Sequence, residues 1–346
     1  MWLTAPVQRT GRVAGPRIAA KARWMRAVWL VALILFLVPG WSGVPRLDLL
    51  GPDAEVTARP VPLDRSDPGR RRVGALTYLG GVELDSPDPV FGGFSSMHVA
   101  GDRFTFLDDG GNIVRFRMGA DWRPRAARFA ALPNGPGRGW EKGDRDSESL
   151  ALSPDGRHAW VGFERFNQIW RYSGDLARVE GKVRPRPMRR WPTNSGAEAM
   201  ARLSDGSFLV LAEEAGPRGK PGTAGLWFAS DPIVARRGFP FRFVPPPGYW
   251  PTDLVELPDR NLLVLVRAIG WRGFRTRLLV VRRAAIRPEA VVRGREVTRF
   301  EPPLVSDNFE ALALTREGGR TILWIASDDN LSFWQRSLLL KFALPD

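Results

Sequence analysis

A motif that recurs at regular intervals constrains the fold of this 346-residue chain more than any other feature. In each unit an acidic residue opens a short apolar run and a turn ends it, as in the segment from Glu148 to Gly156. The units start at 95, 148, 198, 253 and 310, so the intervals are 53, 50, 55 and 57 residues. Ser95 stands in the acidic place of the first unit, and the fourth unit, which opens at Asp253, is one residue shorter. Regular spacing on this scale is typical of folds built from repeated structural units.

The content of each unit identifies the kind of repeat. Short runs rich in β-branched and aromatic residues alternate with Asp-Gly and similar turns, and helical periodicity is nearly absent after residue 70. A β-helix needs a far shorter repeat, and a sandwich would not repeat an acidic-apolar-turn pattern at this spacing. The sequence therefore predicts an all-β fold, a β-propeller with five or six four-stranded blades. We expect the strands at 73–79 and 337–342 to close the ring by sharing one blade.

The N-terminal region has the pattern of an export segment. Residues 27–38 form an unbroken apolar run, which follows Lys21, Arg23 and Arg26 and ends at Pro39-Gly40. A charged region before a short apolar region predicts that residues 1–42 are a signal peptide, or an N-terminal membrane anchor if they are not cleaved. Twelve apolar residues are marginal for spanning a bilayer core of about 30 Å, which favours cleavage. Met25 followed by this run would itself be a complete signal, so translation from Met25 is a further hypothesis.

These features divide the chain into three parts. Residues 43–70 carry five prolines with little periodicity and are interpreted as a Pro-rich linker. Residues 71–345 are expected to form the propeller domain. The protein is accordingly expected in the periplasm or outside the cell, or anchored to the inner membrane, with membrane contact only through an uncleaved N-terminal segment. We expect it to be a monomer.

Composition excludes several kinds of site. The chain has no Cys and only two His, which excludes thiolate metal sites, Cys nucleophiles and His-rich metal centres. The net charge of +14 includes six basic residues from positions 1–42, which leaves +8 for the remainder. The basic residues are scattered, and the run of three at 70–72 stands alone, whereas nucleic-acid-binding proteins concentrate them on one element. We therefore expect no nucleic-acid partner.

The direction of the strands predicts where the repeated acids meet. The acid opens the first strand of a unit, and the second strand runs back from the turn, so its far end lies beside that acid. In propellers the first strand lines the central channel. One rim of the channel should therefore gather these residues: Glu148, Glu198, Asp253 and Glu310 with Asp108, Glu164, Glu213 and Asp328, interrupted by Arg165 and Arg267.

Such a ring needs compensation, because carboxylates a few ångströms apart raise one another's pKa and destabilise the fold. Hard cations with oxygen ligands compensate well, and calcium accepts six to eight oxygens in loose geometry. The alternative is that these acids cap backbone N–H groups or pair with Arg and hold the blades together without a ligand.

Several motifs together resemble a known family. They are FGGFS at 91–95, DSESLA at 146–151, GFER at 162–165, AEAM at 197–200, YWPTD at 249–253, DNFEALA at 307–313 and the segment 327–340. In this order they resemble the phytase-like family described as "esterase-like activity of phytase". The resemblance implies a bacterial, exported propeller and, by distant analogy with calcium-dependent propeller phytases, hydrolysis of phosphoesters.

The resemblance also implies a set of metal ligands. The carboxylates that fit this role are Glu148, Glu164, Glu198, Glu213, Asp253, Glu310, Asp328 and Asp329. Ser95 and Arg267 are departures, since each replaces an acid in its unit. The implied function is that of a calcium-dependent phosphoester hydrolase acting on a small phosphorylated molecule, with Arg165, Arg267 or Arg336 holding phosphate oxygens.

Two other functions stay open at this point. A non-catalytic periplasmic propeller could bind a protein, a sugar or an envelope component, because propellers are common binding platforms and no nucleophile or general base can be identified in the sequence. Ester or lactone hydrolysis is the remaining alternative.

Overall fold

The computed structural model describes residues 25–31, 33, 46–216, 219–271 and 273–345. The chain divides into two compact units, residues 1–46 and residues 47–346. In the first unit, residues 25–31 and 33 are helical. The predicted export segment, its cleavage and the alternative start at Met25 fall mainly outside the described residues. Within the described part of the chain, no helix is both long enough and apolar enough to cross a bilayer.

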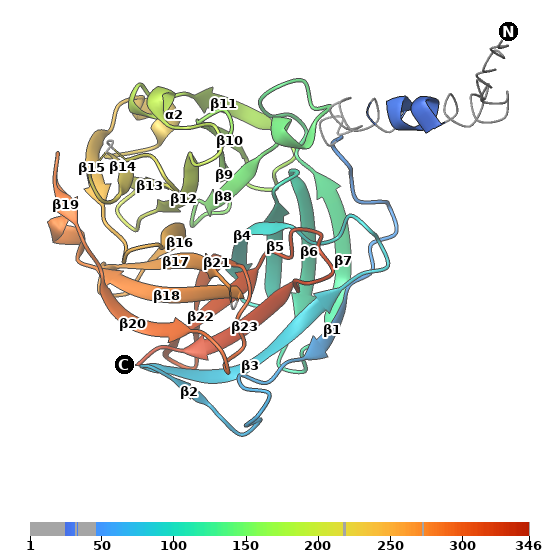
Figure 1. The fold of residues 1–346 in the computed structure, drawn as a ribbon. Helices are drawn as coiled ribbons and strands as arrows, with labels where there is room; N and C mark the ends of the chain where they lie inside the picture. Colours follow the sequence, from blue (N-terminus) through green and yellow to red (C-terminus); the bar gives the residue numbers. More distant parts are fainter. Residues whose placement is uncertain (1–24, 32, 34–45, 217–218, 272, 346) are drawn as a thin grey trace, which may run out of the picture. The chain divides into compact units, whose positions relative to one another are not determined.

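The second unit is a five-bladed β-propeller, so the predicted fold class is confirmed and the number of blades is five (Figure 1). Its five sheets, antiparallel apart from one short strand added at an edge, are arranged around a central axis, and the first strand of each blade lies innermost. The first blade contains β4 (Phe94–Ala100), β5 (Arg103–Asp108), β6 (Asn112–Met118) and β7 (Pro124–Ala131). The second contains β8 (Ser147–Leu152), β9 (His158–Phe163), β10 (Gln168–Ser173) and β11 (Val179–Val183).

The third and fourth blades follow the same order. The third contains β12 (Ala197–Arg202), β13 (Phe208–Ala212), β14 (Thr223–Phe228) and β15 (Phe239–Phe243), with β19 (Val291–Val292) added in parallel at its edge. The fourth contains β16 (Trp250–Glu256), β17 (Leu262–Gly270), β18 (Gly273–Val281) and β20 (Arg295–Phe300). Helical segments are short: η1 (Lys142–Asp144), η2 (Pro187–Arg190), α2 (Pro232–Ala235) and η3 (Arg283–Ala285).

The fifth blade joins the two ends of the domain. It contains β21 (Phe309–Glu317), β22 (Arg320–Ser327) and β23 (Leu338–Ala343), and β3 (Leu76–Asp85) is its fourth strand. β3 pairs antiparallel with β23, as expected for the two strands that were predicted to share a blade. Closing the ring with strands from both ends of the sequence ties the first blade to the last.

The compact unit begins earlier than the sequence predicts. Residues 43–70 were expected to be a linker, but β1 (Thr57–Pro60) pairs with β3, β2 (Arg72–Val73) continues that edge, and the unit starts at Leu47. Val61 and Leu63 are buried in the core of the fifth blade. The prolines misled the prediction because proline is tolerated in edge strands, where a missing N–H costs little.

The hydrophobic core consists of five clusters, one between each pair of neighbouring blades. For example, Phe104 of the first blade packs edge-on against Trp324 of the fifth, with ring centroids 5.0 Å apart. Because the apolar side chains face the adjacent blades, the end of the channel is free to carry polar groups.

Candidate metal centre

Each first strand contains a β-bulge close to its start. The pairing with the second strand shifts by one residue between Phe94 and Ser96, and the other four blades show the same shift. The extra residues are Ser95, Glu148, Glu198, Thr252 and Glu310. A bulge turns a side chain away from the regular alternation of the strand. The five bulge residues therefore form one layer around the same end of the channel, which we call the mouth.

A second layer comes from the ends of the second strands. In four blades the residue after this strand donates its backbone N–H to the carbonyl two positions before the bulge: Asp109 to Gly93, Glu164 to Asp146, Glu213 to Gly196 and Asp328 to Asn308, at 2.9–3.0 Å. In the fourth blade Arg267, opposite Trp250 in the pairing, holds this position. The strands thus bring both layers to one end, as their directions predict.

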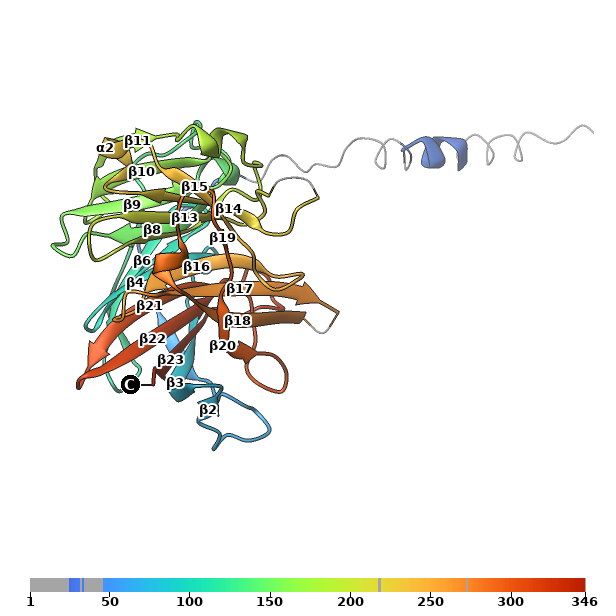
Figure 2. The same ribbon diagram turned by 90° about the vertical axis from the view of Figure 1, so that its left-hand side faces the viewer.

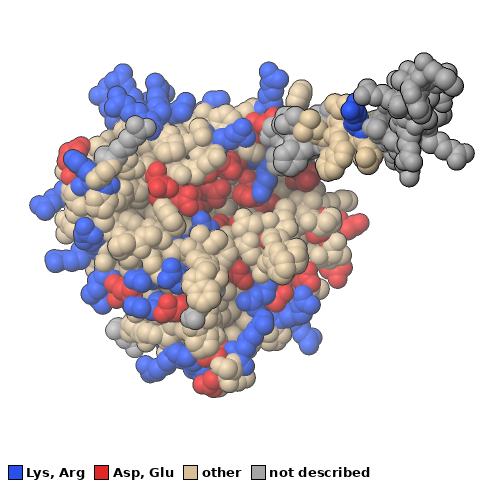
Figure 3. Space-filling view, in the orientation of Figure 1, with Lys and Arg blue, Asp and Glu red and all other residues tan. Residues whose placement is uncertain are grey.

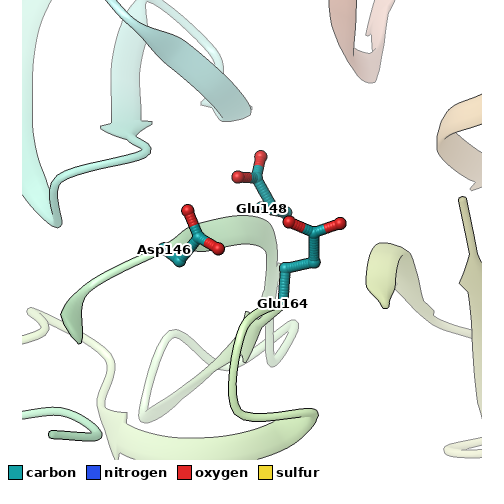
Figure 4. A group of neighbouring side chains, drawn as sticks. All are labelled: Asp146, Glu148 and Glu164. Carbon is teal, nitrogen blue, oxygen red and sulfur yellow. The ribbon is translucent and has the colours of Figure 1, made fainter. Parts of the chain in front are cut away.

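Two overlapping sets of carboxylates have the spacing of a metal site. The first set is Asp146, Glu148 and Glu164, and the second is Glu164, Glu198 and Glu213; within each set, ligand oxygens lie within 4.8 Å of one another. Figure 4 shows the first set, with its three carboxylates gathered beside one another. Figure 3 shows acidic side chains gathered toward the middle of the propeller, with Lys and Arg mainly around its edge.

Burial and mutual repulsion raise the pKa values of these acids. Burial is the larger cause in each case and disfavours the charged form. The nearby Asp146 and Glu213 charges add to it for Glu164, whose pKa is raised to about 8, and Asp109 adds to it for Asp146, whose pKa rises to about 6. The pKa values of Glu148 and Glu198 are raised well above the usual range by burial, with a further contribution from the Glu198 charge for Glu148 and from the Glu213 charge for Glu198. The cluster is thus short of positive charge.

The compensating cations occupy only part of the mouth. Arg267 contacts Glu310 and Asn308 through Nη1 and Glu213 through Nη2 at 3.1 Å. Burial alone would lower the pKa of Arg267, but the surrounding carboxylates raise it by more. Arg267 therefore remains positively charged.

On the first blade, Lys142 Nζ lies 2.5 Å from Asp109 Oδ2. The acids of the second and third blades, Asp146, Glu148, Glu164 and Glu198, form no ion pair with a basic side chain among the residues that the structure describes. A cation bound at the mouth would therefore belong between the second and third blades.

Asp253 does not join this cluster. The bulge of the fourth blade is Thr252, and Asp253 lies one residue further along β16. Its carboxylate accepts the backbone N–H groups of Leu254 at 2.7 Å and Leu312 at 2.6 Å, which ties the fourth blade to the fifth. Burial raises its pKa to about 8. Its place in the structure is that of a backbone cap between blades.

Asp329 and Asp108 also make structural contacts. Asp329 accepts the N–H of Gly93 at 2.9 Å and the hydroxyl of Ser337 at 2.9 Å, linking the fifth blade to the first. Gly92, at φ 138°, leaves room for this carboxylate, because a Cβ there would lie 2.4 Å from Asp329 Oδ1. Asp108 caps the turn at Gly110 and Asn112. Asp109, one residue later, is the member of the ring.

The three arginines proposed to bind phosphate differ in how firmly they are held. Arg267 is committed to its partners inside the ring. Arg336 Nε lies 3.4 Å from Asp307 Oδ2, and its buried Nη1 has no hydrogen-bond partner among the residues that the structure describes. Arg165 follows Glu164 directly, is exposed, and has one long contact of 3.8 Å to Glu141. Of the three, Arg165 is the best placed to reach a ligand at the second blade.

The site also contains four residues that the sequence does not predict as members: Asp109, Lys142, Asp146 and Asn308. The spacing of the repeat could have predicted Asp146, because it stands two positions before Glu148, as Asn308 stands two positions before Glu310. Asn308 Nδ2 lies 2.8 Å from Glu310 Oε1, so this position also points into the ring. Lys142 comes from the connection before the second blade, and no repeat marks it.

Comparison with known protein families identifies one family for this chain. A model of the family "Phytase-like: Esterase-like activity of phytase" matches residues 89–331, which contain both carboxylate sets. Among curated proteins, none matches the chain.

The chain also has distant similarity to several solved structures. The PQQ-bound aldose sugar dehydrogenase from Streptomyces coelicolor is 13% identical, covers 85% of this chain and 100% of its own, and has a TM-score of 0.42. The Pan2 WD40 domain of Neurospora crassa is 11% identical over 80% of this chain and 97% of its own, with a TM-score of 0.37. Hydrazine synthase of Kuenenia stuttgartiensis is 9% identical over 68% and 77%, with a TM-score of 0.41.

Proposed function

Since this chain belongs to the phytase-like family, we propose that it is a metal-dependent phosphoester hydrolase that holds calcium at the mouth of its propeller. The observation that carries this proposal is the pair of carboxylate sets between the second and third blades, which share Glu164. Among the described residues, Glu213 is paired with Arg267, whereas the other four carboxylates have no basic partner. The substrate class is a small phosphorylated molecule.

The donors at the mouth fit a hard cation. All are carboxylate oxygens, which calcium and magnesium prefer, and Glu164 and Glu198 are buried. Their raised pKa values mean that the site binds a cation in competition with protons, as expected for carboxylate ligands. The residues that would hold the ion are Asp146, Glu148, Glu164, Glu198 and Glu213. A bound divalent cation would neutralise phosphate charge and lower the pKa of a water molecule.

The other residues have separate roles in this proposal. Glu164 belongs to both sets, so its carboxylate joins the two halves of the site. Arg165 would donate hydrogen bonds to a phosphate oxygen from the rim beside Glu164. Arg267 neutralises Glu213 and Glu310 and keeps that side of the mouth in place. Lys142 does the same for Asp109.

Phosphate release tests this function. We expect the purified protein to release phosphate from phytate or p-nitrophenyl phosphate with calcium and to lose that activity with a chelator. Glu164→Gln should abolish turnover, and Asp155→Asn, at an exposed turn remote from the mouth, should not change it. No turnover with any divalent cation, although calcium binds, would reject the hydrolase and favour a binding protein.

A further inference from the structure

Large apolar side chains are exposed on three loops around the mouth. Trp140 lies in the connection between the first and second blades and is 71% exposed. Phe333 and Trp334, 84% and 79% exposed, lie between β22 and β23, and their rings pack together at 4.0 Å. The third is the hairpin of β17 and β18, which carries the exposed Ile269 near the end of β17 and the exposed Trp271 in its loop. Figure 2 shows the joined ends of β17 and β18 projecting from the body of the propeller.

The topology places these loops at one end. β9, β13, β17 and β22 all run toward the mouth, so the loops that follow them emerge there. The connection that carries Trp140 leads into β8 at its mouth end. Ile269 lines a cavity of 260 Å³ together with Glu213, Arg267 and Asn330, which places the β17–β18 loop beside the segment 328–337.

The opposite end of the channel, which we call the turn end, differs in composition. There the first and second strands are joined by turns such as 153–157 and 204–207, whose exposed residues are Pro154, Asp155, Gly156, Arg157, Ser204 and Asp205, with no large apolar side chain among them. Among the described residues of the loops at this end, Val234 in α2 is the exposed large apolar side chain, at 70%. Single exposed apolar residues are ordinary, whereas several around one opening indicate an interaction surface.

The chain enters the propeller at the mouth, beside the exposed apolar loops. The backbone N–H of Leu47 donates to the carbonyl of Trp140 at 3.0 Å, so the domain begins beside an exposed aromatic residue. The apolar run at 27–38 precedes it by only eight residues. An extended chain spans at most about 3.6 Å per residue, so Leu47 lies within roughly 30 Å of the end of that run.

We propose that the loops carrying Trp140, Ile269, Trp271, Phe333 and Trp334 rest on a lipid bilayer, with residues 27–38 retained as the tether. Tryptophan is enriched where membrane meets water, because its ring is apolar and its N–H is polar. Arg138 lies 5.8 Å from the centroid of the Trp140 ring, and arginines near apolar surface keep their charge at the interface. The proposal does not depend on hydrolysis or on calcium. It orients the molecule with its mouth toward the lipid headgroups.

The absence of Cys from the chain allows a direct test. Single variants Phe333→Cys and Val234→Cys of the full chain would each carry one polarity-sensitive dye at an exposed position. Both are reconstituted into phosphatidylcholine vesicles in the presence of chelator, so that calcium cannot bridge carboxylates to lipid phosphates. We expect the dye at position 333 to shift to the blue and become protected from an aqueous quencher, while the dye at position 234 stays in water.

A second pair of variants separates docking from tethering. Trp140→Ser with Trp334→Ser should reduce protection at position 333 while the protein stays bound to vesicles through residues 27–38. Val234→Ser is the matched control and should change nothing. Equal exposure of both dyes in vesicles would overturn the proposal. So would protection of position 333 that rises with protein concentration in the absence of lipid, since that would show a second copy covering the surface.

Discussion

The two ends of the channel are built from the same five pairs of strands, yet their acidic residues have opposite environments. At the turn end, Asp155 lies 2.6 Å from Arg157, Asp102 lies 2.8 Å from Arg117, and Asp205 pairs with Arg283. The Ser153 hydroxyl lowers the pKa of Asp155. Ser207 and Arg283 lower the pKa of Asp205 to about 2, although partial burial opposes them. At the mouth, burial and neighbouring acids raise the pKa of Glu148, Glu164 and Glu198.

The difference shows that the repeat uses its two acids for separate purposes. The acid in the turn is satisfied locally, by a hydroxyl, backbone N–H groups or an arginine, and helps to define the hairpin. The acid in the bulge is turned into a space shared by several blades, where Glu148 and Glu198 have acidic neighbours and Glu310 contacts Arg267. Groups with raised pKa values in a common recess are candidates for function, whereas locally paired acids stabilise structure.

The largest effect should come from removing the carboxylate that both metal sets share. Glu164→Gln keeps an oxygen that can accept the Gly196 N–H, bonded at 3.0 Å in the parent, but loses the charge. We expect calcium affinity, measured by calorimetry, to fall by more than about 100-fold, beyond the loss typical of outer-shell partners.

Thermal unfolding with and without calcium supplies the control for this variant. Calcium at a hundredfold excess over Kd should stabilise the parent by about 2.7 kcal/mol, whereas the variant should not respond. Asp155→Asn at the turn end should behave as the parent. Unchanged calcium affinity in Glu164→Gln would show that the ion, if bound, lies elsewhere.

The pH dependence of stability should separate the two ends. A carboxyl whose pKa is higher in the folded than in the unfolded state favours folding at low pH, and this contribution is lost as pH rises through the folded pKa. Without metal, the melting temperature should therefore fall between about pH 4 and pH 8, driven by Asp146 and Glu164. Asp205 acts in the opposite sense, and its contribution is lost as pH falls toward about 2.

Saturating calcium should reduce the fall in melting temperature between pH 4 and pH 8. It should leave the loss of stability toward pH 2 unchanged. The measurement is a series of melting curves in chelator and in calcium. A slope between pH 4 and pH 8 that is the same in both buffers would mean that calcium does not bind these carboxylates.

Removal of Asp253 should produce a smaller and purely structural effect. Asp253→Ala leaves the N–H groups of Leu254 and Leu312 without their acceptor, which typically costs about 1–3 kcal/mol for each buried group left unpaired. Chemical denaturation should show this loss, and calcium affinity should match the parent. If calcium no longer stabilised this variant, Asp253 would have to be counted among the metal ligands.

The smallest effect concerns the bulges that carry a hydroxyl. Ser95 Oγ donates to the carbonyl of Ser147 at 2.5 Å, and Thr252 Oγ1 donates to the carbonyl of Phe309 at 3.2 Å, so each links its blade to the next. Ser95→Ala and Thr252→Val should each cost about 1 kcal/mol in urea denaturation. The same loss from a substitution at an exposed serine such as Ser230 would argue against a specific link.

The sequence predicts the propeller and its closure because period and strand alternation are local properties of the chain. It also predicts the end of the channel where Glu148, Glu198 and Glu310 meet, because strand direction follows from the turns. The fourth unit was predicted to open at Asp253 because an acid was expected at this position, whereas the bulge residue is Thr252. In all five blades the turn residue lies seven positions after the bulge, as from 148 to 155 and from 252 to 259, so the spacing itself pointed to Thr252.

Other members of the site could not be predicted from the sequence. Lys142 and Asp109 meet because one loop folds over the first blade, and no spacing encodes that contact. The role of Arg267 depends on which acids its guanidinium reaches across the mouth, which only the assembled ring determines. The start of the domain at Leu47 was missed because β1 is an edge strand held by β3, a partner distant from any turn signal.

The bulges have a consequence for how such a protein can change. Because each extra residue lies outside the regular pairing, the strand below it keeps its register whether the residue is Ser, Thr or Glu. The five bulge positions therefore accept different side chains while the structure of the blades stays the same. The ligand chemistry of the channel can therefore change by substitution at one bulge position at a time. Such a substitution alters the charge of the channel and does not require the hydrophobic core to repack.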